Sequence, residues 1–344
     1  MNSYGENLLA WYDQHQRTLP WRSPPGAAPD PYHVWLSEIM LQQTTVATVK
    51  GYFDKFLRMW PTVDAMAASR QEDILDAWAG LGYYARARNL HKCAQEVVQN
   101  HQGQFPRTAA DLKTLPGIGD YTSAAIAAIA FGEPVGVVDS NVERIVSRLF
   151  RISTPLPKAK KLIQEKTDQI TPFDRPGDFA QAMMDLGSSL CSPKNPDCNI
   201  CPFCSLCQAQ TRGDMETFPV KPPKKTKPTR LIIAFAPMHE GSILLERRPD
   251  SGLLGGMPGL FSTPWVEQDT HPKDYPAYAP CPGDWTELNG ESKHTFTHFH
   301  LITRLVSAEV PKRSNVENGF WIKKAELQTL GFPTVFKKML ELLP

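Results

Sequence analysis

The sequence predicts a protein of two parts, an α-helical region followed by a separate α+β domain. Apolar residues recur at helical spacing over most of residues 8–190, as in 32–50 and 179–190. From residue 231 onward the pattern changes to short strand-like runs, and a terminal helix is predicted over 333–343. Between the two parts, Lys221 to Arg230 contains three prolines, five basic residues and no acid, which indicates a stiff, exposed linker.

Length and composition bound the class of protein. A chain of 344 residues has room for two or three domains, each with its own core. Hydrophobic residues are 41% and charged residues 21%, which is typical of a globular chain. The net charge of +1 means that any basic surface for nucleic acid must be local. No apolar run suits a signal peptide or a membrane span, so we expect a cytoplasmic protein with reduced thiols.

A glycine turn lies between two predicted helices in the middle of the first part. Thr108, with Asp111 three residues later, predicts the start of a short helix, and 122–130 predicts a second one. Between these helices, Gly117 and Gly119 permit a tight turn with positive φ. Such a turn directs unpaired N–H groups outward, which suits a phosphate, although a plain helix connection is the alternative.

A carboxylate in an apolar helix and an aromatic residue near an arginine indicate candidate catalytic and nucleic-acid-binding positions. Glu38 lies within the apolar helix predicted over 32–50, where a carboxylate is costly unless it is paired or protonated. The alternative is a Glu at the helix edge that reaches water. Gln43 follows in an uncharged polar cluster that can hydrogen-bond bases or backbone. Further on, Tyr83 stands close before Arg86, a combination that fits stacked bases and phosphates, although a buried tyrosine explains it nearly as well.

The cysteines indicate a metal centre. Five of the seven lie between Cys191 and Cys207, which in a reducing compartment favours metal ligation over disulfides. Four of them are separated by six, two and five residues, with Cys204 as a fifth. Four thiolates on short loops can hold a [4Fe–4S] cluster or tetrahedral zinc, and the spacing slightly favours iron–sulfur.

Several of these stretches together resemble the adenine DNA glycosylase family. The resemblance rests on Trp35 to Thr44, Gly80 to Arg88, the Leu-Pro-Gly-Ile-Gly turn ending at Gly119, Asp139 and the cysteine series. It implies an all-helical helix-hairpin-helix glycosylase with a [4Fe–4S] module, followed by an α+β Nudix-like domain. It also implies removal of adenine mispaired with 8-oxoguanine or guanine in double-stranded DNA, by an enzyme that extrudes the base from the stack. We expect it to act as a monomer.

The resemblance also implies domain boundaries. We expect an N-terminal segment that packs with the iron–sulfur module, a six-helix barrel with the hairpin, the iron–sulfur module, a basic linker and the Nudix-like domain that reads 8-oxoguanine. These predictions span residues 1–29, 30–133, 134–215, 216–230 and 231–344, respectively.

The same resemblance implies catalytic roles. Glu38 would be the general acid that protonates adenine, helped by an apolar surround that raises its pKa. Asp139 would stay ionised and stabilise the oxocarbenium-like sugar, with support from hydrogen bonds of Asn141. Tyr121 would line the adenine pocket beside Glu38, and Gln181 falls where the family contacts the adenine edge.

Binding residues and metal ligands are implied in the same way. The family's cluster ligands correspond to Cys191, Cys198, Cys201 and Cys207. Tyr83 and Gln43 match residues that wedge into the duplex. The residues expected to contact substrate or DNA are Arg22, Gln43, Tyr83, Gly117, Gly119, Gln181, His294, Phe296, Thr297 and His298.

Three departures refine the expectation. Endonuclease III-like relatives carry a lysine where this chain has Tyr121, so a monofunctional glycosylase is favoured over a strand-cleaving lyase. Around Glu246 and Gly255, the tail lacks the glutamate pair with which a Nudix hydrolase holds magnesium, so the tail resembles a reader of the oxidised base. Thr297 occupies a position where the family usually has Ser.

Two other functions compete with this one. A lyase for damaged pyrimidines would need some other amine. A non-catalytic DNA-binding protein would need neither Glu38 nor Asp139.

Overall fold

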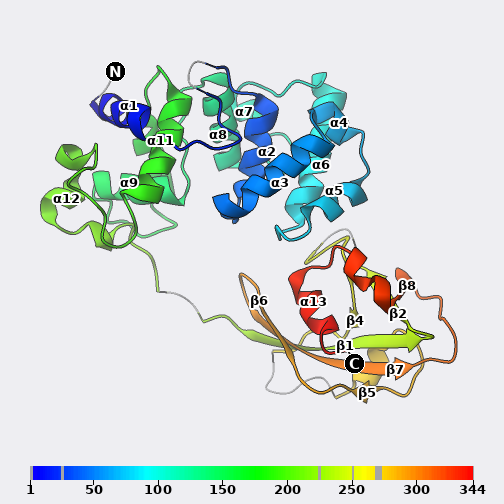
Figure 1. The fold of residues 1–344 in the computed structure, drawn as a ribbon. Helices are drawn as coiled ribbons and strands as arrows, with labels where there is room; N and C mark the ends of the chain where they lie inside the picture. Colours follow the sequence, from blue (N-terminus) through cyan, green and yellow to red (C-terminus); the bar gives the residue numbers. More distant parts are fainter. Residues whose placement is uncertain (1–2, 25–26, 224–225, 250–251, 268–272, 344) are drawn as a thin grey trace. The chain divides into compact units, whose positions relative to one another are not determined.

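The structure, a computed structural model, describes residues 3–24, 27–223, 226–249, 252–267 and 273–343. The chain divides into two compact units. The first comprises Met1–Ser69 and Asn89–Pro223, and the second comprises Arg70–Arg88 and Lys224–Pro344. Figure 1 follows the chain through both.

The first unit is helical, as the sequence predicts. Its helices, with α6 beginning in the segment assigned to the second unit, are α1 (Ser3–His15), α2 (Pro31–Leu41), α3 (Val46–Met59), α4 (Val63–Ala67), α6 (Ala85–His101), α7 (Ala109–Leu112), α8 (Asp120–Phe131), α9 (Ser140–Leu149), α10 (Lys160–Ile170), α11 (Pro176–Ser189) and α12 (Gln208–Arg212). Short 3-10 turns follow at Cys204–Leu206 and Met215–Thr217.

One predicted helix is wrong in its extent. The structure breaks 32–50 into α2 and α3, with a turn between Leu41 and Val46. Gln43 in this turn has a φ of 59°, and the side chain of Thr45 caps α3 by accepting a hydrogen bond from the Thr48 N–H (3.3 Å). Four polar residues, 42–45, interrupt the apolar pattern at this turn, but the prediction of one helix over 32–50 does not treat that interruption as a helix end.

The glycine turn lies between two helices, as expected. Thr108 caps α7 by accepting a hydrogen bond from the Asp111 N–H (3.1 Å). Gly117 adopts a positive φ of 76°, and a Cβ there would lie 2.6 Å from that of Asn89, so both conformation and space require glycine. The predicted positive φ is wrong for Gly119, which is extended and forms the N-cap of α8.

The core of the first unit joins its N-terminal helix to the helices that precede the cysteines. Buried apolar residues of α1, α9, α10 and α11 form one cluster, which includes Leu8, Val146, Ile163 and Leu186. α11 also packs against α8, and α8 packs against α2. Helix α8 therefore lies between the helix that carries Glu38 and the helix that carries Gln181 (Figure 1).

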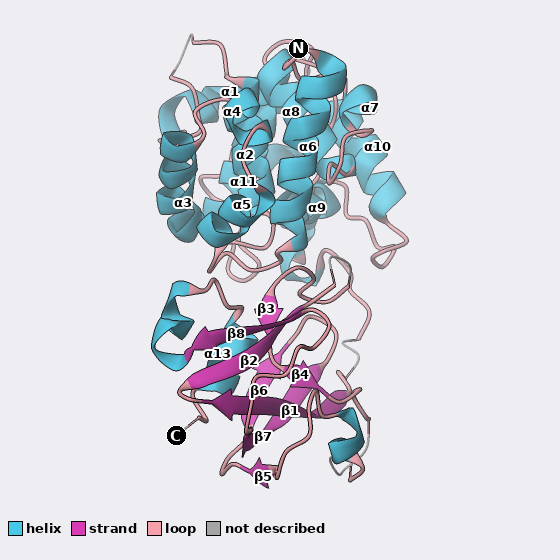
Figure 2. Ribbon diagram, turned by 90° about the vertical axis from the view of Figure 1, so that its right-hand side faces the viewer, coloured by secondary structure: helices cyan, strands magenta, loops and turns pink. Residues whose placement is uncertain are grey.

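The second unit contains all the named strands (Figure 2). These are β1 (Thr229–His239), β2 (Ser242–Arg247), β3 (Pro258–Gly259), β4 (Phe261–Ser262), β5 (Thr286–Glu287), β6 (Ser292–Thr295), β7 (His300–Glu309) and β8 (Gly319–Lys323). Its helical segments are α5 (Gln71–Trp78), α13 (Thr334–Leu340) and 3-10 turns at Tyr275–Tyr278 and Lys324–Thr329. The main strands and the terminal helix lie where the sequence predicts them.

The sheet is mixed. Its main path has the strand order β3-β2-β1-β7-β5. β1 and β7 run parallel with Phe235 opposite Val306, whereas β8 pairs antiparallel with β2 and β6 pairs antiparallel with β7. Helix α13 packs Val335, Phe336 and Met339 into the apolar core of the sheet.

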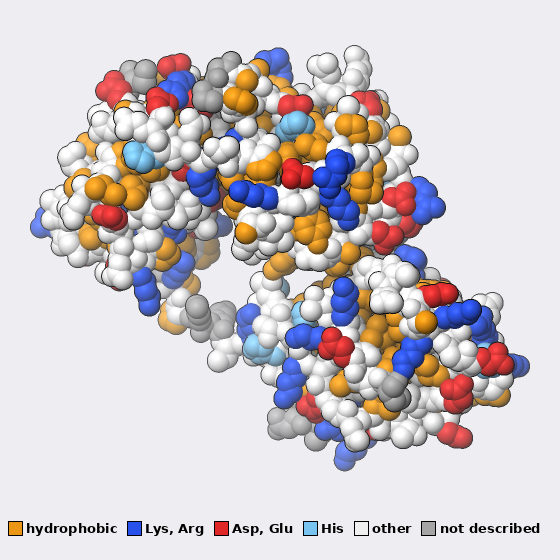
Figure 3. Space-filling view, viewed as in Figure 1, with side chains coloured by type: hydrophobic (Ala, Val, Ile, Leu, Met, Phe, Trp, Pro, Cys, Tyr) orange, Lys and Arg blue, Asp and Glu red, His pale blue; other side chains and the backbone are white. Residues whose placement is uncertain are grey.

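The surface carries both signs of charge. Figure 3 shows Lys and Arg side chains lying among Asp and Glu side chains on each unit, in keeping with the net charge of +1. Within the described ranges, no helix has the length and apolar character needed to cross a membrane.

Candidate active site

Glu38 is the buried carboxylate of the first unit. It lies near the C-terminal end of α2 and is 5% exposed. The Tyr121 hydroxyl, from the first turn of α8, donates a hydrogen bond to its Oε2 (2.8 Å). Met184 of α11 lies on the same hydroxyl, with its sulfur 3.8 Å away. Glu38 and Met184 line a cavity of about 50 Å³, and Tyr121 contacts Glu38 without being one of the residues that line this cavity.

The surroundings of Glu38 favour its protonated form. Burial raises the pKa of Glu38 from 4.5 to about 7. This value is a net result: besides burial, the negative charge of Asp139 raises the pKa, whereas the hydrogen bond from Tyr121 and the positive charge of Arg22 lower it. A carboxyl with a pKa near 7 can hold a proton and give it up at neutral pH.

Asp139 has the opposite surroundings. It is the N-cap of α9, and its Oδ1 accepts hydrogen bonds from the backbone N–H groups of Asn141 (2.8 Å) and Val142 (2.7 Å). Its Oδ2 accepts a third bond, from the side-chain amide of Asn141 (2.9 Å). Three donors and the positive end of a helix dipole stabilise a negative charge on this carboxylate.

Asn141 is itself held by a buried arginine. Arg144, one turn along α9, donates to Asn141 Oδ1 (2.9 Å), to the Gly187 carbonyl (2.7 Å) and to the Cys191 carbonyl (2.7 Å). Gly187 packs directly on Asn141, since an added Cβ would lie 2.5 Å from the Asn141 Cβ. The side chain beside Asp139 is therefore locked by contacts from α11 and from the first cysteine.

An ion cluster next to Glu38 escaped the sequence analysis. Asp185 of α11 is 2% exposed and accepts two hydrogen bonds from Arg22 (2.7 and 2.8 Å), as well as bonds from Arg17. Arg22 also lines the Glu38 cavity. No local signal marked Asp185, because Gln181, Ser188 and Ser189, which lie one turn away on its helix, are also polar.

The predicted contact of Gln181 with the adenine edge stays a prediction. The Gln181 side chain lines the Glu38 cavity. The structure therefore brings Arg22, Glu38, Tyr121 and Gln181 together, while Asp139 acts on Glu38 through its charge.

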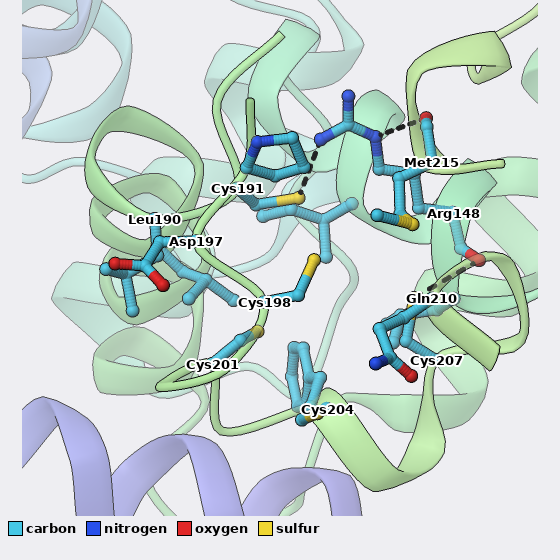
Figure 4. A pocket seen from close by; sticks show the side chains of 15 residues that line it. Arg148, Leu190, Cys191, Asp197, Cys198, Cys201, Cys204, Cys207, Gln210 and Met215 are labelled. Atoms are coloured by element: carbon cyan, nitrogen blue, oxygen red, sulfur yellow. Dashed lines mark hydrogen bonds between the residues drawn. The ribbon is translucent and has the colours of Figure 1, made fainter. Parts of the chain in front are cut away.

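The cysteines line a second cavity (Figure 4). All five thiols of the series contribute to it, together with an apolar shell that includes Leu186 and Phe203. The buried guanidinium of Arg148 donates to Cys191 Sγ (3.3 Å) and to the carbonyls of Ser192 (2.7 Å) and Pro193 (3.0 Å). An N–H donor directed at a thiol sulfur stabilises the thiolate form that metal ligation requires.

These residues fit the donor set of an iron–sulfur cluster. In the part of the chain that the structure describes, no three Cys, His, Asp or Glu side chains are placed to hold a metal ion. In a [4Fe–4S] cube, each thiolate bonds a different iron, so its ligands surround a larger group than one ion. Cys204 lines the same cavity as the four expected ligands. The ligand set Cys191, Cys198, Cys201 and Cys207 stays a prediction.

Four of the expected DNA-contacting residues in the helical hairpins and turns are exposed. Gln43 projects from the turn between α2 and α3, and Gly117 and Gly119 are exposed in the hairpin. Tyr83 is 52% exposed and has a positive φ of 49°, with the Arg86 guanidinium 5.6 Å from its ring centroid. These positions are accessible to a duplex, and their contacts with DNA stay a prediction.

The expected recognition loop is the tight turn between β6 and β7. The Phe296 N–H donates to the Phe299 carbonyl (2.9 Å), which closes the turn and leaves Thr297 and His298 exposed at its tip. The His294 ring packs edge-on against Phe296 (4.6 Å between centroids), and burial lowers the pKa of His294. The Thr297 hydroxyl at the tip shares a hydrogen bond with the Tyr83 hydroxyl (3.2 Å), and the His298 side chain is exposed beside it.

Comparisons with known proteins define the class. Residues 36–172 match the model of the HhH-GPD superfamily of base excision DNA repair proteins, and residues 233–342 match that of the NUDIX domain. The protein is a helix-hairpin-helix DNA glycosylase of base excision repair with a C-terminal Nudix-like domain, as the sequence predicts.

Relatives with the same two parts give the family. The human adenine DNA glycosylase is 33% identical over 402 residues, covering 98% of this chain and 73% of the relative. The enzyme of Buchnera aphidicola subsp. Baizongia pistaciae is 32% identical, covering 97% of this chain and 95% of the relative. The chain belongs to the adenine DNA glycosylase family.

Solved structures agree on the fold of the helical part. A thermostable thymine-DNA glycosylase superposes with a TM-score of 0.55 at 28% identity, covering 61% of this chain and 97% of that one. A trapped endonuclease III–DNA covalent intermediate gives a TM-score of 0.51 at 21% identity, covering 62% and 99%.

Proposed function

We propose that this enzyme hydrolyses the N-glycosidic bond of adenine mispaired with 8-oxoguanine or guanine in duplex DNA. The observation that carries the proposal is the buried Glu38 carboxyl, whose pKa of about 7 and hydrogen bond from Tyr121 suit a general acid. That the excised base is adenine is inferred from the relatives, which are named adenine DNA glycosylases.

In this proposal, Glu38 acts first. Adenine is a poor leaving group as an anion, so Glu38 donates its proton to the base as the bond to C1′ breaks. Tyr121 holds the carboxyl in place, because its hydroxyl is fixed by α8. The electron pair of the broken bond stays with the protonated base, which leaves as neutral adenine.

Asp139 then faces the positive charge on the sugar. Its carboxylate is fixed by three donors from α9, so it stabilises the oxocarbenium-like sugar by charge or by transient covalent attachment. A water molecule adds to C1′ and loses a proton, which leaves an abasic site. With Tyr121 in the place of the lyase lysine, no amine at that position can form a Schiff base, and the enzyme acts as a monofunctional glycosylase.

The other parts of the chain support this reaction. The cysteine cavity holds a [4Fe–4S] cluster through Cys191, Cys198, Cys201 and Cys207. Arg144 and Arg148 contact the loop of these cysteines and would hold it in place around the bound cluster. The loop from His294 to His298 reads the base opposite adenine, while Gln43 and Tyr83 enter the duplex.

The test of the reaction uses duplexes that carry adenine opposite 8-oxoguanine, opposite guanine or opposite thymine. Alkali-sensitive abasic sites are expected at adenine in the first two and not in the third. Glu38→Gln should still bind the mismatched duplex but lose nearly all excision, because an amide has no proton to give. Normal single-turnover excision by Glu38→Gln would refute the role of this residue.

Two further measurements test the cofactor and the absence of lyase activity. Protein purified anaerobically should contain about four irons per chain; Cys204→Ser should keep them and Cys198→Ser should lose them. Stoichiometric zinc instead of iron would contradict the cluster.

Borohydride should trap no covalent DNA adduct at the rate of base loss, and efficient trapping would favour a lyase.

A further inference from the structure

The Glu38 cavity shares a wall with a much larger cavity. The larger one, here called the rear cavity, has a volume of about 620 Å³ and is lined by Tyr12, Gln16, Ala130, Gly132, Phe173 and Arg175, among others. Four residues line both cavities: Trp21, Arg22, Ile129 and Gln181. With about 50 Å³, the Glu38 cavity has room for a few water molecules and must widen to admit a base, whereas the rear cavity is already large enough for a small-molecule ligand.

The two cavities lie at different positions along α8. Tyr121, which bonds Glu38, stands at the start of this helix, directly after the hairpin. Ile129 borders both cavities, and Gly132, just past the end of the helix, lines only the rear one. Since an α-helix rises about 1.5 Å per residue, the end of α8 lies roughly 16 Å from Tyr121. The rear cavity therefore opens at the end of the helix away from the hairpin.

The shared wall has one fixed part and one movable part. Arg22 is held by its two hydrogen bonds to the buried Asp185. Gln181, in contrast, makes no side-chain hydrogen bond within the described residues, and it is only partly buried. A glutamine side chain without a fixed partner can change rotamer at little cost. Gln181 is thus the natural gate between the two cavities.

The lining indicates what the rear cavity accepts. Tyr12, Trp21 and Phe173 supply aromatic surface for a planar ligand. Among the described residues that line it, both cations are already paired, Arg22 with Asp185 and Arg175 with Asp13 and Asp178. No lining cation is left for a phosphate, so the cavity suits a neutral heterocycle rather than a nucleotide.

We propose that the rear cavity is an exit site for the free purine base, which leaves the Glu38 cavity past Gln181. The inference rests on the proposed function, because it needs a base released beside Glu38. It explains how the product departs while the duplex still covers the front of the site, and it assigns a binding step to a cavity that the chemistry itself does not use.

The experiment separates bond cleavage from base release. A duplex with radiolabelled adenine opposite 8-oxoguanine is bound by excess full-length protein. Alkali treatment reports cleavage, and retention of the label with the protein–DNA complex on a filter reports release. Ala130→Trp places a large ring in the rear cavity without touching the Glu38 cavity. Gln16→Trp fills it from another wall. Ala68→Trp, at the exposed end of α4, is the matched control.

Both filling variants should cleave at the normal rate but release the label about tenfold more slowly. The control should cleave and release at the normal rates. Thermal unfolding identifies any variant that fails to fold. If a folded variant with a filled rear cavity releases adenine at the normal rate, the exit-site proposal is overturned. It is also overturned if cleavage slows as much as release does. If the unaltered protein forms no alkali-sensitive sites, the proposed function itself fails and the exit site falls with it.

Discussion

Glu38 and Asp139 are two carboxylates that the same unit keeps in contrasting surroundings. Glu38 is buried among apolar side chains and accepts one hydrogen bond, from Tyr121. Asp139 is half-buried at the start of α9 and accepts three hydrogen bonds. Burial raises the pKa of Glu38 despite the bond from Tyr121, which favours the protonated acid, whereas three donors and a helix N-terminus offer partners for a negative charge on Asp139. One acid and one anion can thus act on the two ends of a single bond.

The difference also lies in how each group is supported. Glu38 depends on the packing of α2, α8 and α11 around it, because desolvation is the main cause of its raised pKa. Asp139 depends on donors from its own helix and on the chain of contacts from Asn141 through Arg144 to the first cysteine. Mutations that loosen the packing around Glu38 should therefore change its pKa, whereas mutations that displace Asn141 should weaken the hydrogen bonds to Asp139.

The largest effect is expected for Asp139→Asn. An amide keeps the size of the side chain but removes the negative charge from beside the sugar, so single-turnover excision should fall roughly a hundredfold to a thousandfold. Mismatch binding should persist. Asp54→Asn, an exposed aspartate on α3, is the control and should excise normally. An Asp139→Asn variant with near-normal excision would show that the charge is not used.

The pH dependence of Glu38 sharpens the contrast. The proton on Glu38 is present below a pH of about 7 and is lost above it, so excision limited by this acid should fall about tenfold per pH unit on the alkaline side. This measurement needs single-turnover rates between pH 5.5 and 9. A rate that is flat across this range would contradict a raised pKa in the working enzyme.

The same group links stability to pH. Because the folded-state pKa is raised from 4.5 to about 7, the stabilisation is fully present below about pH 4.5 and is lost as the pH rises to about 7. Glu38→Gln removes this loss. The variant should therefore gain up to roughly 3 kcal/mol over the unaltered protein at pH 8.5 and little at pH 4.5. Urea unfolding at the two values of pH measures the difference, and an equal change at both would show that the effect is packing alone.

Gly187→Ala should act on Asp139 without touching it. An added Cβ would lie 2.5 Å from the Asn141 Cβ, so Asn141 must shift and its bond to Asp139 Oδ2 must weaken. We expect a drop in excision of about tenfold, in line with the loss of one hydrogen bond to a charged group. The matched control is Gly51→Ala in α3, where nothing lies within 4 Å of the added methyl. Equal excision by both variants would show that Asn141 does not position Asp139.

Particular residues show how far the sequence alone could lead. Local spacing and capping residues, which can be read from the sequence, predict the two separate parts, the strands and the short helix capped by Thr108. The pairing of Glu38 with Tyr121 joins residues 83 positions apart, and only the family resemblance suggested it. The bonds from Arg17 and Arg22 to Asp185 span 163 positions or more, and nothing local predicts them. The break at Gln43 depends on one residue with a positive φ, within four polar residues that can also lie on the exposed face of a continuous helix.

The smallest effect is expected at the exposed tip of the loop between β6 and β7, whose surroundings differ from those of Glu38 and Asp139. Thr297 is exposed, so its substitution should not disturb the fold. Its hydroxyl also shares a hydrogen bond with the Tyr83 hydroxyl (3.2 Å), so Thr297→Ala removes that bond together with any contact to the opposite base. Thr297→Ala should lower the preference for 8-oxoguanine over guanine by roughly 1–3 kcal/mol, while excision opposite guanine stays unchanged. Thr297→Ser keeps the hydroxyl and should be nearly neutral. Thr286→Ala, an exposed threonine in β5, is the control and should keep the full preference. The measurement is the ratio of single-turnover rates on the two duplexes. If Thr297→Ala lowers both rates equally, this hydroxyl contributes to DNA binding in general and does not distinguish the two bases.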